Sequence, residues 1–305
     1  VAETPALREA FKELLPSMTE FWSKITLNEQ LWIRLLEFSR TDEASSLQGL
    51  KKRHLDHTLN EFRRSGADLV AEDKEILAIL RLELSKLEQK FAENVLDATN
   101  AYSLLLTDLS QLDGLPEENK VLACQKAQAV GKEGWLLTLD YPTFEPVMKY
   151  VRSREVRREL YVAYVTRCRD GDFSNVSIIK DLLNLRRKLA EILGHRDFVD
   201  YILENRMAKK GEIAFEFVDD LTRETKPYWI RDIAHLREHS QELGLVELQP
   251  WDVDFVKENL RSTLFGIDDE TTRPYFPIQR VFEGLFKLVE EVFGPVMTIY
   301  VYDAE

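Results

Sequence analysis

Helical periodicity between residues 72 and 102 constrains the fold of this chain more than any other feature of its sequence. Apolar residues recur there at spacings of three and four, which is the period of one face of an α-helix and not that of a β-strand. We therefore predict one long helix from about Glu72 to beyond Tyr102. The residues available for burial along it are Ile76, Ile79, Leu80, Leu82, Leu84, Leu87, Phe91 and Val95.

Similar amphipathic segments occupy most of the remaining chain, and short connections separate them. The 305 residues include only 12 glycines and 10 prolines, which argues against a loop-rich all-β fold. Gly194 and Gly244 stand where two helices are expected to end. The fold class is therefore predicted as mostly α, a multi-helix bundle. Helices are predicted to start at Thr4-Pro5 and at Asn28, and to span Leu47–Arg64, Lys120–Val130, Thr143–Tyr150, Ser153–Cys168, Asn175–Leu193, Asp197–Met207 and Gly211–Leu243.

Two short stretches are predicted as isolated strands. Trp135–Leu139, with the sequence WLLTL, is closed by the turn sequence DYP. Met297–Tyr302, with the sequence MTIYVY, is rich in β-branched and aromatic residues. Leu248–Phe255, LQPWDVDF, is interpreted as a turn or a short extended piece. The mostly helical fold is therefore expected to contain one or two isolated strands.

A rigid aromatic turn leads into a helix within Thr272–Gly294. Pro274 and Pro277 restrict the backbone around Tyr275 and Phe276, because proline fixes φ and biases the preceding residue toward extended structure. The segment after it has helical apolar periodicity and ends at a glycine. Such a turn and helix belong in the middle of a large core, yet only eleven residues follow them. We therefore expect an architecture whose chemistry lies beyond this chain.

The charge and the cysteine usage exclude several classes of function. A net charge of −13 disfavours nucleic-acid and anionic-membrane binding, and the basic runs Lys51–Arg53 and Arg154–Arg158 are predicted to lie on solvated helix faces. There is no leader sequence and no apolar run long enough for a membrane span, so we expect a cytoplasmic protein without membrane contact. Cys124 and Cys168 lack CxxC partners and are expected to be buried thiols in a reducing compartment.

The histidines offer one candidate metal site, on the predicted helix Gly211–Leu243. No HExxH motif occurs, but His235, Glu238 and His239 fit the inverted form HxxEH. The third ligand of such a site would come from a downstream carboxylate such as Glu283, Glu290 or Glu291. The surrounding sequence is polar nearly all round, which favours a solvent-facing helix over a buried metal pocket. We therefore predict no metal site here.

Other candidate sites are weaker still. His54 and His57 lie three residues apart on a helix and are expected to bind metal adventitiously at most. There is no GxSxG motif, no glycine-rich phosphate loop and no histidine partner for Cys168. A set of aromatic residues could line a peptide-binding cleft, but core packing is the favoured interpretation. These residues are Tyr228, Trp229, Trp251, Phe255, Tyr275 and Phe276.

Several stretches, taken together and in order, resemble one family of enzymes. They include the sequences GWLLTLDYPTFEPVMKY, HRDFVDYILENRMAK and RPYFPIQRVFEGLFKLVEEVFG. The chain is similar in these stretches to the oligopeptidase A/thimet oligopeptidase family of zinc metallopeptidases. The matching segments are Asn94–Tyr102, Gly134–Tyr150, Arg154–Arg167, His195–Lys209, Leu248–Phe255 and Arg273–Gly294.

The resemblance implies a helical, two-lobed fold of the neurolysin/oligopeptidase-A type, in which a deep channel admits short peptides. A zinc ion, held by an HExxH helix and a further glutamate, would activate the attacking water. All of these family residues are expected to follow the position of Glu305, so no catalytic or metal residue is assigned to this chain. Residues 1–133 are predicted to form part of an N-terminal helical lobe, and residues 134–305 a second helical portion that leads toward the zinc segment.

The sequence therefore predicts the non-catalytic portion of a zinc metalloendopeptidase, inactive by itself and binding no zinc of its own. Its expected partners are short peptides and the missing catalytic segment. Two alternatives remain open. The chain could be a catalytically inactive peptide-binding or scaffold homologue, or it could be one half of a split peptidase whose other half is encoded separately.

Overall fold

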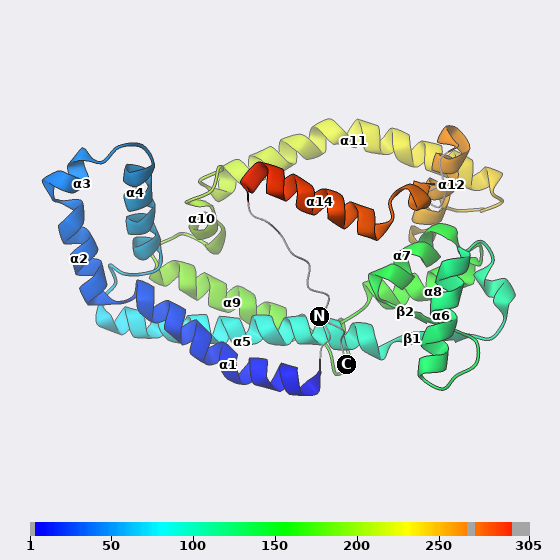
Figure 1. Ribbon diagram of the computed structural model, residues 1–305, viewed down its shortest axis with the longest axis horizontal. Helices are drawn as coiled ribbons and strands as arrows, with labels where there is room; N and C mark the ends of the chain where they lie inside the picture. The colour runs from blue at the N-terminus through cyan, green and yellow to red at the C-terminus, as the bar shows by residue number, and fades with distance from the viewer. Residues whose placement is uncertain (1–3, 267–271, 295–305) are drawn as a thin grey trace.

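The computed structural model describes residues 4–266 and 272–294, and nearly all of its regular structure is helical (Figure 1). The mostly α fold class is confirmed. The first half contains α1 (Pro5–Thr26), α2 (Glu29–Ser39), α3 (Asp42–Ser46), α4 (Gly49–Arg64), α5 (Ala71–Ala101), β1 (Ser103–Leu106), α6 (Glu117–Ala129), β2 (Trp135–Thr138) and α7 (Tyr141–Tyr150). The second half contains α8 (Arg154–Val165), α9 (Val176–Ile192), α10 (Phe198–Leu203), α11 (Gly211–Glu242), α12 (Val253–Phe265) and α14 (Ile278–Phe293). Short 3₁₀ turns lie at Leu109–Leu112, Pro250–Asp252 and Arg273–Tyr275.

The predicted helix starts and stops are explained by capping. The Thr4 hydroxyl accepts a hydrogen bond from the Leu7 amide at 3.2 Å, and the Asn28 side chain accepts one from the Leu31 amide at 2.9 Å. At the end of α9, Gly194 has φ +77°, a left-handed conformation that a glycine adopts without strain. The helix ends could be predicted from the sequence because their free backbone groups form hydrogen bonds with residues close in sequence.

The two long helices α5 and α9 pack side by side and form one hydrophobic core (Figure 1). Helix α1 packs along α5 as well. The buried residues of this core are Leu77, Leu80 and Leu84 from α5 and Ile178, Leu182, Leu185 and Leu189 from α9. The apolar stripe predicted on α5 is therefore largely used, although Ile76 and Ile79 are about half exposed, at 48% and 58%.

The prediction that the long helix continues beyond Tyr102 is wrong. Helix α5 ends at Ala101, and Ser103–Leu106 forms β1, which pairs antiparallel with β2. The strand predicted around Trp135 is confirmed, and it has a partner that the sequence did not predict. Gly134 precedes β2 with φ +116°, and a Cβ atom there would collide with the carbonyl oxygen of Leu106. Glycine is therefore required where the two strands meet.

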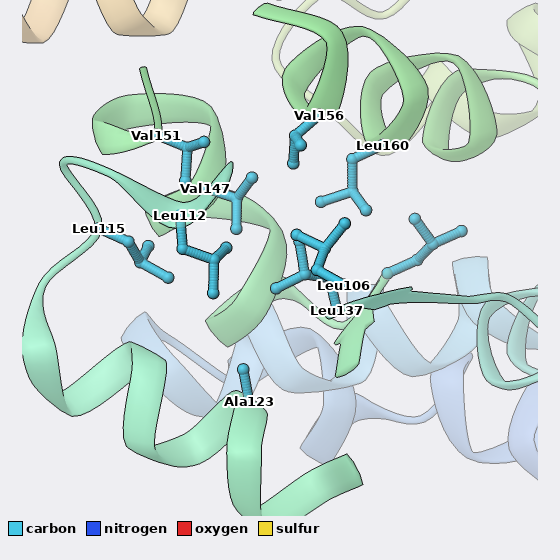
Figure 2. Close-up of a cluster of buried hydrophobic side chains, with 10 residues drawn as sticks. Leu106, Leu112, Leu115, Ala123, Leu137, Val147, Val151, Val156 and Leu160 are labelled. Atoms are coloured by element: carbon cyan, nitrogen blue, oxygen red, sulfur yellow. The ribbon is translucent and has the colours of Figure 1, made fainter. Parts of the chain in front are cut away.

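A second hydrophobic core surrounds this two-stranded sheet (Figure 2). Leu106 and Leu137 project from the strands toward side chains of α7 and α8 (Figure 2). Its buried members are Leu106, Leu112, Leu115, Ala123, Leu137, Leu139, Val147, Val151, Val156 and Leu160. The core joins residues on both sides of the predicted boundary between 133 and 134, and that division into two portions stays a prediction.

The end of the molecule that carries α7, α8 and α12 contains a buried ion-pair network. The side chains of Arg157 and Asp252 are 1% and 0% exposed, and Arg157 Nη2 donates to Asp252 Oδ1 at 2.8 Å. Arg154 also donates to the Asp252 carboxylate, from Nη2 to Oδ2 at 2.7 Å. The backbone amide of Gln249 adds a further hydrogen bond to Oδ2 at 3.1 Å. We call Arg154, Arg157 and Asp252 the buried arginine–aspartate network.

This network connects α8 to the turn that begins α12. The remaining Arg157 donors bind backbone carbonyls, with Nη1 at 2.7 Å from Val151 O and Nε at 3.2 Å from Trp251 O. The guanidinium also lies 4.2 Å from the centroid of the Phe255 ring. The prediction that the run Arg154–Arg158 forms a solvated face is therefore wrong for Arg157, because its charge is paired inside the core.

Two further predicted segments are settled differently by the structure. Leu248–Phe255 contains the 3₁₀ turn, and its last three residues form the first turn of α12, a helix that the sequence did not predict. The predicted strand Met297–Tyr302 lies outside the described residues. No helix in the described part of the chain combines the length and the apolarity that crossing a membrane requires.

Breaking the network from either side is expected to destabilise the fold. Arg157→Met or Asp252→Asn should each lower the free energy of unfolding by about 3–5 kcal/mol, because a buried charge loses its partner. The matched control is Arg34→Met, which removes an exposed pair with Glu37 and should cost at most about 1 kcal/mol. Urea unfolding followed by circular dichroism measures both. Equal losses in network and control variants would contradict this assignment.

The cost of Asp252→Asn is expected to depend on pH. Burial by itself raises the pKa of Asp252, but hydrogen bonds from Arg154, Arg157 and the Gln249 amide outweigh it, and the pKa lies below its ordinary value. A carboxylate with a depressed folded-state pKa stabilises the fold above its unfolded pKa of about 3.9, and loses this contribution as the pH falls through the folded value.

The difference in free energy of unfolding between the wild-type protein and Asp252→Asn should therefore be largest near neutral pH and shrink below about pH 4. Urea titrations over this pH range measure the difference. A difference that is constant with pH would show that the carboxylate charge contributes nothing.

Candidate functional site

The candidate HxxEH residues lie near the end of α11 and differ in exposure. His235 and Glu238 are exposed, whereas His239 is 8% exposed. Both ring nitrogens of His239 already have partners, Nδ1 at 2.8 Å from Glu242 Oε2 and Nε2 at 2.8 Å from Asn259 Oδ1. The polar sequence predicted a solvent-facing helix. This prediction is wrong at His239, because its imidazole packs between α11 and α12.

The remaining candidate ligands are dispersed. Glu283, Glu290 and Glu291 are exposed on α14, and His54 and His57 are exposed on α4. Within residues 4–266 and 272–294, no group of three or more histidine, cysteine, aspartate or glutamate side chains could hold a metal ion. The described residues therefore do not fit a zinc ion, and no chemical step is assigned through one.

Cys124 lies on α6, and Cys168 follows the end of α8. Cys124 and Cys168 are free thiols of intermediate burial. The Cys168 thiol donates to the carbonyl oxygen of Asn94 at 3.3 Å. Burial raises the pKa of Cys168, and the nearby charge of Arg167 only partly opposes the shift. Since the thiolate is the reactive form of cysteine, a raised pKa lowers the reactivity of this thiol.

The feature that distinguishes this structure is the exposure of α11. Every residue from Phe215 to Asp232 is exposed, and the helix packs against α10 near its start and α12 near its end. Figure 1 shows α11 crossing the molecule along the side opposite α5 and α9. A helix that is apolar on more than one face is ordinarily buried. The large apolar side chains exposed on this segment are Phe215, Phe217, Val218, Leu221, Tyr228, Trp229 and Ile230.

Helix α14 and the turn before it are exposed in the same way. Tyr275 and Phe276 are 80% and 70% exposed, and only Phe286 and Val289 of α14 are half-buried. The apolar periodicity that predicted the helix is confirmed, but most of the face that it marks is exposed.

The favoured interpretation of the aromatic set as core is wrong for most of its members. Trp251 and Phe255 are half-buried beside the buried arginine–aspartate network. The others, Tyr228, Trp229, Tyr275 and Phe276, are exposed. Aromatic content and spacing indicate which residues prefer burial. They carry no information on whether the partner that buries them is part of the same chain.

Comparison with known proteins gives these observations a context. Residues 147–300 match the model described as Peptidase family M3. The chain belongs to this family. Family M3 consists of zinc-dependent metallopeptidases, which are hydrolases. Together with the relatives given below, this match confirms the resemblance to the oligopeptidase A/thimet oligopeptidase family.

The family M3 chain is similar to oligopeptidases A from several organisms. It is 34% identical to oligopeptidase A of Salmonella typhimurium over 300 residues and 35% identical to that of Escherichia coli over 302 residues. It is 33% identical over 304 residues to the probable cytosolic oligopeptidase A of Arabidopsis thaliana. Each match covers 96% of this chain but only 43–44% of the relative. The chain therefore spans less than half the length of these relatives.

Substituting the two histidines of the HxxEH motif should separate packing from metal binding. His239→Ala is expected to lower the free energy of unfolding by about 1–3 kcal/mol, because Asn259 and Glu242 lose a buried partner. His235→Ala, the matched control on the exposed side of the helix, should change it by less than about 0.5 kcal/mol. Urea unfolding and zinc analysis by mass spectrometry test both. A loss of bound zinc in both variants would revive the motif as a metal site.

Proposed function

We propose that this chain forms the non-catalytic helical portion of an oligopeptidase-A-type zinc metalloendopeptidase, and that it neither binds catalytic zinc nor hydrolyses peptides by itself. Membership of family M3 supports the peptidase assignment, as does the identity to oligopeptidases A over nearly the whole chain. The described residues provide no cluster of ligands for the zinc that the family uses.

The observation that carries the proposal is the exposed middle of α11. Leaving a large apolar side chain in water instead of burying it forgoes about 1.5–3 kcal/mol. Seven such side chains between Phe215 and Asp232 are exposed by 51–74%. The matched relatives are more than twice as long as this chain. In this proposal, the part of the peptidase that the chain does not match buries these side chains.

The parent activity in this proposal is endopeptidase cleavage of short peptides in the cytoplasm. Zinc and the catalytic groups belong to the other portion, while this chain forms part of the wall of the channel. The proposed division at residues 133 and 134 separates the N-terminal lobe portion from the portion that leads toward the zinc segment. The family M3 match at residues 147–300 lies wholly within the second portion.

A second candidate function is a catalytically inactive peptide-binding homologue, and the aromatic turn favours it. Tyr228, Trp229, Tyr275 and Phe276 expose flat apolar rings of the kind that hold peptide side chains. A split peptidase is the third candidate. In a split peptidase, the exposed helices α11 and α14 would pack against a separately encoded polypeptide.

Zinc analysis and a peptide-cleavage assay test the proposed function. Purified chain free of affinity tags should contain far less than one zinc per chain and should not cleave a quenched-fluorescent peptide. Stoichiometric zinc together with turnover that a chelator abolishes would overturn the proposal. Anisotropy of a labelled short peptide distinguishes the second candidate, because tight binding by the isolated chain is expected only if it is a peptide-binding homologue.

A further inference from the structure

Helix α14 has a single continuous apolar face, and that face is exposed. Its large apolar residues recur at spacings of three and four, so they share one side of the helix. Phe282 and Phe286 stack on this side, with ring centroids 6.0 Å apart. The exposed members of the face, 45–76% exposed, are Ile278, Val281, Phe282, Leu285, Leu288, Val292 and Phe293. We call these seven residues the α14 stripe.

The other side of α14 is polar and provides little support for the helix. It carries Arg280, Glu283 and the pair of Lys287 with Glu291, whose charged atoms are 4.0 Å apart. An i,i+4 pair contributes only a few tenths of a kcal/mol to a helix. In proteins most of the stability of an amphipathic helix comes from packing of its apolar face. The α14 stripe is therefore a surface shaped for another element to cover.

The family comparison shows that α14 lies within the peptidase match. The family M3 match runs to residue 300 and so contains the whole of α14, which makes this helix part of the peptidase and not an appended tail. The matched relatives are more than twice as long as this chain. An amphipathic helix with anchors at i, i+3, i+4 and i+7 fits an apolar groove on its partner.

We propose that the α14 stripe docks in an apolar groove on the zinc-binding portion of the peptidase, the part of the relatives that this chain does not match. This inference rests on the proposed function and names the surface through which the two portions join. In the docked state Leu285 and Leu288 lie near the centre of the contact, where substitutions cost most. The polar side of α14 remains in water.

Co-expression with a known relative tests the docking. The probe is the part of Escherichia coli oligopeptidase A outside its 302-residue match, produced in the same cells as this chain and carrying the only affinity tag. The wild-type chain should co-purify with the probe. Leu285→Asp and Leu288→Asp should each weaken the complex by at least about 100-fold, because they place a charge in an apolar contact.

Matched variants separate docking from loss of folding. Lys287→Asp introduces the same side chain on the polar side of α14 and should co-purify like the wild-type chain, as should Leu285→Met, which conserves volume. Because the stripe is exposed, circular dichroism and thermal unfolding of the chain alone should be unchanged in all four variants. Failure of the wild-type chain to co-purify, or equal binding by the stripe variants, would overturn the docking. Self-association of the chain, seen by size-exclusion chromatography and lost in Leu285→Asp, would also overturn the docking. It would show that the α14 stripe binds a second copy of this chain.

The same preparations distinguish failure of the docking from failure of the proposed function. Peptide cleavage and stoichiometric zinc in the chain alone would overturn the function. An inactive, zinc-free chain whose complex is insensitive to Leu285→Asp and Leu288→Asp would leave the function standing and remove only the α14 stripe as its contact surface.

Discussion

The buried carboxylate of Asp252 lies at the junction that positions the end of α11. It is shared between Arg154 and Arg157 of α8 and the Gln249 amide, so it fixes the turn that starts α12. Helix α12 in turn holds the end of α11 through the contact of His239 with Asn259. A buried carboxylate is tolerated only when its charge and lone pairs are satisfied, which leaves this turn a single favourable orientation.

From this fixed point α11 extends away from α12 along a side of the molecule where it has little support. The two largest hydrophobic cores lie elsewhere, one between α5 and α9 and the other around β1 and β2 (Figures 1 and 2). The described structure thus combines well-packed hydrophobic cores with two helices, α11 and α14, whose apolar side chains are exposed. This arrangement is compatible with the function that we propose, in which the chain forms part of a larger peptidase.

Sequence reasoning succeeded wherever the deciding contacts are local. The helix starts at Thr4 and Asn28 and the stop at Gly194 depend on groups within a turn of the helix end, and they were predicted. It failed where the partner is distant. The long helix was predicted to continue beyond Tyr102, and β1 was missed, because the strand that pairs with β1 lies more than 25 residues away in the sequence. The burial of Arg157 was missed because Asp252 follows 95 residues later.

The sequence alone determined the helical class, the family and the residues that seek burial, because periodicity, capping and motif order are written along the chain. Only the tertiary structure decided which of those residues are buried. The apolar periods of α5 and α14 look equivalent in the sequence, yet one faces α9 and the other faces solvent. The reason is physical: the hydrophobic effect rewards removal of any apolar surface from water, and it specifies neither the partner nor the chain from which that partner comes.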